Sequence, residues 1–90
     1  MMAEQDVALW PTQSNYERFR DLCDDEVPSS FEEFESIANS RIDVLRREHE
    51  VIIEKMLFDP EAMAIWCRAN FGKIDAEARR HYAAVLRLSN

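Results

Sequence analysis

The chain has 90 residues, of which 47% are hydrophobic and 32% are charged, and its formal net charge is −7. This composition is typical of one small globular domain and excludes a disordered chain. The single glycine and three prolines leave few turn residues, and no run alternates long enough to indicate a strand. The sequence therefore predicts a single all-α domain over residues 1–90, a small four-helix fold.

Residues 1–13 are expected to form an extended N-terminal arm. Residues 7–10 make an apolar patch ahead of Pro11, and a proline holds the residue before it in an extended conformation. We expect Trp10 to dock on the helices and close one end of the core. The alternative is that this patch binds a partner, since chain termini are often poorly ordered.

A first short helix is expected after Ser14, which forms a capping box with Glu17. Carboxylates near a helix C-terminus meet the negative end of its dipole, so residues 24–26 are expected to end this helix. Its apolar face recurs at steps of three and four, at Tyr16, Phe19, Leu22 and Cys23.

The longest helical pattern runs from a capping box at Ser30 to Phe58 and contains no glycine. We expect one long central amphipathic helix over about residues 30–58, with three shorter helices packed on it. A helix of this length measures about 42 Å, so a second copy of the chain could cover part of it as a homodimer through the long helix. Its apolar stripe comprises Phe31, Phe34, Ile37, Ala38, Ile42, Leu45, Ile52, Ile53, Met56 and Leu57.

Two further helices complete the predicted fold. Asp59 caps the third helix and Pro60 takes its first position, where the missing N–H has no cost. Gly72 is placed to end this helix in a left-handed conformation. Asp75 then caps the last helix, which is expected to extend to about Leu88.

The sequence predicts no metal site, no cofactor and no enzyme. Cys23, His49, Cys67 and His81 are each solitary, whereas a structural zinc site takes its ligands in close pairs. His49 is expected to be a partly buried histidine, with a pH switch or metal ligand as the alternative. No catalytic or phosphate-binding motif is present. The two distant cysteines, with no signal peptide or membrane-length apolar run, favour a cytoplasmic protein with reduced thiols.

Acidic residues concentrate in the first part of the chain, where a cluster lies between the first two predicted helices. We expect a small acidic protein–protein interaction module, such as an inhibitor, an antitoxin-like protein or a phage-type protein. Its partner would have a basic surface, as a nucleic-acid-handling machine does. The predicted contact residues are Asp21, Asp24, Asp25, Glu26, Glu32, Glu33 and Glu35.

Two alternatives remain open. The first is a helix-turn-helix-like regulator that binds DNA through Arg79, Arg80 and Arg87 of the basic last helix. Its layout fits poorly, because Arg68 falls where that motif wants a small residue. The second alternative is a structural subunit of a larger assembly, which would cover the rest of the long helix.

Overall fold

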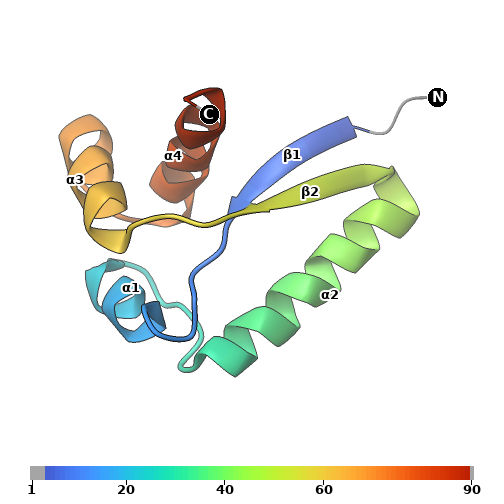
Figure 1. Cartoon of the computed structure of the whole chain (residues 1–90), viewed down its shortest axis with the longest axis horizontal. Helices are drawn as coiled ribbons and strands as arrows, with labels where there is room; N and C mark the ends of the chain where they lie inside the picture. Colours follow the sequence, from blue (N-terminus) through green and yellow to red (C-terminus); the bar gives the residue numbers. More distant parts are fainter. Residues whose placement is uncertain (1–3, 90) are drawn as a thin grey trace.

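The computed structural model describes residues 4–89 and contains four helices and a two-stranded parallel sheet. The prediction of an all-α helical bundle is therefore wrong, and the domain belongs to the α/β class (Figure 1). In chain order the elements are β1 (Glu4–Leu9), α1 (Tyr16–Leu22), α2 (Phe31–His49), β2 (Val51–Met56), α3 (Pro60–Phe71) and α4 (Ala76–Leu88).

The long central helix expected over residues 30–58 is also wrong, because α2 ends at His49. Glu50 adopts the left-handed conformation, with φ 55° and ψ 34°, and its N–H donates to the carbonyl of Leu45. The chain then continues as β2, which pairs in parallel with β1. Residues 51–53 are all β-branched and favour an extended backbone. Their pairing strand lies far earlier in the chain, outside the window from which helical periodicity is read.

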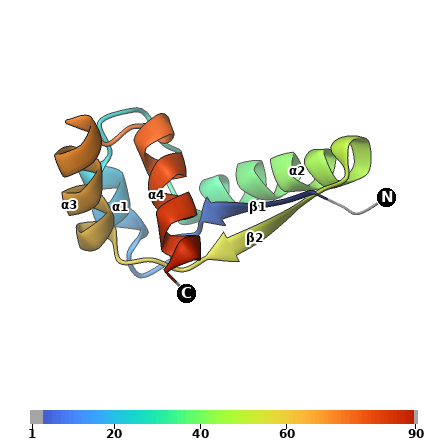
Figure 2. The same ribbon diagram turned by 90° about the horizontal axis from the view of Figure 1, so that it is seen from above.

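The molecule has two parts that are clear in both views (Figures 1 and 2). Helices α1, α3 and α4 gather at one end, and the sheet with α2 projects away from them. The main core lies among the three helices, where Met63, Cys67 and Ile74 are fully buried. A smaller core of Val7, Met56 and Ala83 joins both strands to α4.

Helix α2 is only partly covered. None of its 19 residues is buried, and Ile37 is 43% exposed. Its N-terminal end is held by aromatic contacts, because the Phe34 ring lies 5.1 Å from the Trp10 ring and 5.6 Å from the Tyr16 ring. Trp10 is 8% exposed and so docks on the helices as the sequence indicated. Helix α2 also contacts β2.

The predicted helix starts at Ser30, Asp59 and Asp75 are confirmed, whereas the predicted start of α1 and the predicted end of α2 are wrong. Gly72 ends α3 with φ 74°. The capping box at Ser14 does not form: Asn15 precedes α1, and its side-chain oxygen accepts from the N–H of Thr12 at 2.8 Å. The confirmed N-caps accept from the helix backbone, Ser30 from the N–H of Glu33 at 3.1 Å, Asp59 from Glu61 at 3.1 Å and Asp75 from Ala78 at 3.0 Å.

Candidate functional site

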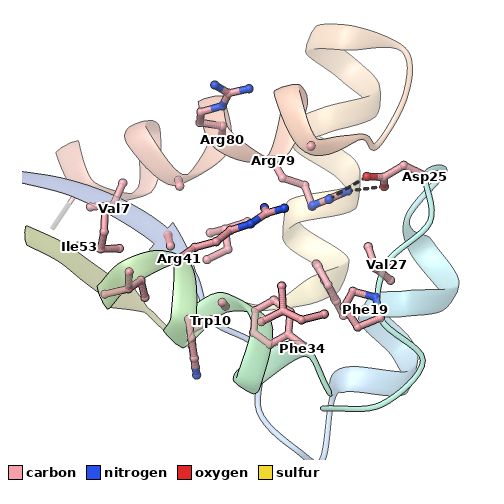
Figure 3. Close-up of a pocket in the computed structure, with 18 of the residues that line it drawn as sticks. Val7, Trp10, Phe19, Asp25, Val27, Phe34, Arg41, Ile53, Arg79 and Arg80 are labelled. Atoms are coloured by element: carbon pink, nitrogen blue, oxygen red, sulfur yellow. Dashed lines mark hydrogen bonds and ion pairs between the residues drawn. The ribbon is translucent and has the colours of Figure 1, made fainter. Parts of the chain in front are cut away.

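A groove of about 540 Å³ lies between α2 and α4, and we call it the β1 groove (Figure 3). Residues 7–10 of the β1 segment form its floor, and Phe19 with residues 25–28 lies at one end. This volume is within the usual range for ligand sites, about 300 to 1,000 Å³. The wall from α2 comprises Phe34, Ile37, Ala38, Arg41, Ile42 and Leu45, and the wall from α4 comprises Ala76, Arg79, Arg80 and Ala83.

The floor of the β1 groove is the unpaired edge of β1. The N–H of Glu4 donates to the carbonyl of Glu50 at 3.1 Å, and the N–H of Trp10 donates to that of Met56 at 2.8 Å. In a parallel sheet, every second residue of a strand hydrogen-bonds through its backbone to the same neighbouring strand. The backbone N–H and C=O groups of the even-numbered residues of β1 therefore point to β2. The odd-numbered residues 5, 7 and 9 direct their backbone groups away from β2. In agreement, the N–H of Val7 donates to its neighbour's side chain.

Three arginines lie along the groove, and one of them is neutralised. Arg79 donates to both carboxylate oxygens of Asp25, at 2.7 and 3.0 Å. Burial is the largest single influence and lowers the pKa of Arg79, but the hydrogen bond to Asp25 and the nearby negative groups together outweigh burial, so the pKa of Arg79 is raised. Within residues 4–89, Arg41 and Arg80 form no ion pair. Figure 3 shows Arg41 reaching from α2 toward Arg79. Arg41, Arg79 and Arg80 line the groove together with the acids Asp25 and Glu26, so the lining carries a net positive charge.

Two of the predicted contact acids hold the fold together. The carboxylate of Asp24 accepts from the N–H of Ile74 at 2.7 Å, and the N–H of Asp24 donates to the carbonyl of Ile74 at 2.8 Å. Asp25 pairs with Arg79 of α4. Both acids therefore tie the link between α1 and α2 to the second half of the chain, which explains why acids accumulate in this turn.

The other predicted contact acids lie at the surface around α1 and the start of α2. Asp21, Glu26, Glu32 and Glu33 are exposed, whereas Glu35 is half-buried. Glu32 accepts from the amide of Gln13 at 3.2 Å, and Glu33 accepts from the hydroxyl of Ser29 at 3.0 Å. Glu26 also lines the β1 groove.

The arginines of the DNA-binding alternative are not gathered into one free patch. Arg79 is paired with Asp25, and Arg80 lines the β1 groove. Arg87 donates to the side-chain oxygen of Gln5 at 3.2 Å. Helix α4 is also in contact with both α3 and β1, which leaves less of its surface for a DNA groove.

Cys23 and Cys67 belong to the main core, whereas His49 and His81 are exposed. Burial raises the pKa of the Cys23 thiol to about 11, with Arg79 opposing and the nearby carboxylates adding to the effect. Burial also raises the pKa of Cys67, so both thiols are protonated and weakly nucleophilic at neutral pH. His49 is exposed at the end of α2, contrary to expectation, and His81 lies against the Phe71 ring at 5.1 Å. Among residues 4–89, no group of three or more His, Cys, Asp or Glu could hold a metal ion.

Comparisons of the chain with protein-family models, with curated proteins and with solved structures found no match. No helix within residues 4–89 has both the length and the apolar character needed to cross a membrane.

Sequence reasoning missed the β1 groove because it placed the α2 stripe and residues 51–57 on one helix. The β-branched run at Val51, Ile52 and Ile53 was the available sign of a strand. Had this strand been recognised, α2 would have been predicted to end earlier. Its apolar stripe would then have lacked a full set of packing partners.

Proposed function

We propose that the chain is a small non-enzymatic module that binds an apolar, acid-bearing segment of a partner protein in the β1 groove. The observation that carries this proposal is the groove itself, which combines apolar walls with Arg41 and Arg80. Apolar surface that is left open in a small protein is typical of interaction sites. The two arginines favour a carboxylate-bearing occupant through charge complementarity.

The open apolar surface continues along α2 beyond the groove. Ile37 lines the groove and is 43% exposed, and Val44 is 38% exposed. A helix of this length in a stable domain usually buries one full apolar stripe. A bound segment that covers Ile37, Ala38, Ile42 and Leu45 would supply that burial.

The absence of catalysis is part of the proposal. A cysteine nucleophile needs a base within hydrogen-bond reach, and a lowered pKa favours its reactivity. Both thiols have raised pKa values, and within residues 4–89 no hydrogen bond joins a cysteine to a histidine. We also place the protein in the cytoplasm, because Cys23 and Cys67 are both free. An inhibitor, an antitoxin-like protein or a phage-type protein is the class that fits such a module.

A peptide-display selection tests the proposal. Random peptides would be selected on the immobilised protein and then compared on Ala38→Trp, which fills the groove from α2. The matched control is Ala69→Trp, an exposed position on α3 outside the groove. We expect apolar peptides with carboxylates that bind the wild type and the control but at least about tenfold more weakly to Ala38→Trp. Selected peptides that bind all three proteins alike would contradict the proposal.

A partner with a basic surface is the second candidate, and the exposed acids around α1 favour it. Asp21, Glu26, Glu32 and Glu33 are available to such a partner without disturbing the fold. Its binding would weaken steeply with salt and would be reduced by Glu32→Lys together with Glu33→Gln. Binding in the β1 groove would be insensitive to these two changes, which separates the two candidates.

A further inference from the structure

We propose that the bound segment adds to the free edge of β1 as a third strand of the sheet. This inference rests on the proposed function and specifies how the groove holds its occupant. Strand addition to an exposed sheet edge is a common mode of peptide recognition, in which the backbone supplies affinity and alternate side chains supply specificity.

The two helices cover opposite faces of the sheet, which creates a slot beside β1. Val7 packs on Ala83 of α4, while Trp10, which faces the other side of the sheet, packs on Phe34 of α2. Successive side chains of a strand point to opposite faces. Because residues of both helices line the groove with the β1 edge at its floor, α2 and α4 extend past that edge (Figure 3). Parallel sheets normally have both faces covered in this way but contain more strands.

The backbone of β1 has unmet hydrogen bonds at this edge. Within the part of the chain that the structure describes, no hydrogen bond is formed by the N–H of Leu9, which faces the groove. The N–H of Val7 donates to the carboxylate of Asp6 at 2.8 Å. That carboxylate takes the hydrogen bond that the carbonyl of an added strand would otherwise accept. A third strand would replace it and pair with Val7 and Leu9.

The β2 edge is a poorer site for an added strand. Only Ile53 of β2 lines the groove, so the groove walls flank β1 rather than the outer edge of β2.

The walls specify the chemistry of the added strand. One face of the strand would meet Ile42, Leu45 and Arg41 of α2, and the other would meet Ala83 and Arg80 of α4. A neighbouring strand lies about 4.8 Å away, so its side chains reach both walls. The occupant is therefore an extended segment with β-branched residues and carboxylates.

The test uses a blocked seven-residue peptide in which valine and glutamate alternate. Two versions carry N-methyl groups, one on the amides of the valines and one on those of the glutamates. Successive backbone N–H groups of a strand point to opposite sides, so in an added strand either the valine amides or the glutamate amides face β1, but not both. Affinity is measured by titration calorimetry on the wild type and on Ala38→Trp, with a valine–lysine peptide as the charge control.

We expect one methylated peptide to bind at least about tenfold more weakly than the parent and the other to bind within about threefold. The lysine peptide and Ala38→Trp should each reduce binding at least about tenfold. Strand addition is overturned if both methylated peptides bind like the parent, if both lose affinity equally, or if the parent does not bind. The first of these results, with binding still lost in Ala38→Trp, leaves the proposed function standing. The display selection decides that function independently.

Discussion

Asp25 and Arg79 form a bidentate ion pair, with Nη1 of Arg79 2.7 Å from Oδ1 of Asp25 and Nη2 3.0 Å from Oδ2. The pair joins the link between α1 and α2 to α4, and the Arg79 side chain is only 15% exposed. An acid that the sequence assigned to a partner is thus bonded within the fold. The β1 groove begins beside this pair.

Removing either member of this pair should destabilise the protein. Arg79→Ala leaves the Asp25 carboxylate without its donor in a partly buried site, and we expect the free energy of unfolding to fall by about 1 to 3 kcal/mol. Urea denaturation of Arg79→Ala, Asp25→Ala and the double variant measures this. The double variant should lose less than the sum of the two single losses, because the second change removes an already unpaired group. Strictly additive losses would show that the two side chains do not interact.

Asp24 should matter for stability more than its acidic neighbours do. Asp24→Ala removes the acceptor for the N–H of Ile74, a fully buried residue, and we expect a loss of about 1 to 2 kcal/mol in unfolding free energy. Asp21→Ala is the matched control at an exposed position, expected to change stability by less than about 0.5 kcal/mol. Equal effects of the two changes in urea denaturation would argue against a structural role for Asp24.

Stability should fall at alkaline pH because of Cys23. Burial raises the pKa of its thiol from 9.0 to about 11. The folded protein therefore holds this proton more tightly than the unfolded chain, so the contribution is complete below about pH 9 and is lost as the pH rises through 11. We expect it to amount to about 1 to 2 kcal/mol after allowing for the partial exposure of the thiol.

Urea denaturation at intervals between pH 8 and pH 11 measures this loss, with Cys23→Ala as the control. The alanine variant should lose less stability over the same interval. A residual loss is expected from Cys67, Tyr16 and Tyr82, because burial raises the pKa of the Cys67 thiol and of both phenols. Identical pH profiles for wild type and variant would contradict the assignment to Cys23.

Asp6 should compete with the added strand. Its carboxylate accepts the hydrogen bond from the N–H of Val7, which an added strand would need. Asp6→Ala should therefore tighten binding of the valine–glutamate peptide by about threefold to tenfold. Asp6→Asn keeps an acceptor but removes the charge, and it should lie between wild type and Asp6→Ala in titration calorimetry. Equal affinities for the Asn and Ala variants would mean that charge alone matters and that the Val7 N–H is not used.

Local chemistry explains which parts of the fold could be predicted. The side chains of Ser30, Asp59 and Asp75 accept hydrogen bonds from backbone amides two or three residues later in the chain. The start of each of these helices therefore depends only on residues close together in the sequence and can be predicted from it. Gly72 is similar, because its left-handed conformation depends on its own missing side chain. The parallel pairing of β1 with β2 is a contact between distant segments. Periodicity within α2 could not reveal it, and residues 51–57 therefore continued the helical pattern.

The candidate site could not be predicted for the same reason, because it depends on contacts between distant segments. The sequence displays the Arg41 charge and the apolar stripe of α2, but the β1 groove exists only once a strand edge lies between two helices. Likewise, the carboxylates of Asp24 and Asp25 look free in the sequence. Their partners, Ile74 and Arg79, are about fifty residues away. Composition drew attention to these acids but could not tell a structural contact from a binding surface.

Amide hydrogen exchange over residues 51–56, followed by NMR, tests the central claim most directly. In β2 the N–H groups of Ile52, Glu54 and Met56 point to β1, whereas those of Ile53 and Lys55 point to the other edge. We predict slow exchange at the first three positions and faster exchange at the other two. Adding the valine–glutamate peptide should then slow exchange at Leu9. Uniformly slow exchange from Val51 to Met56, as in a continuous helix, would contradict the sheet and the groove built on it.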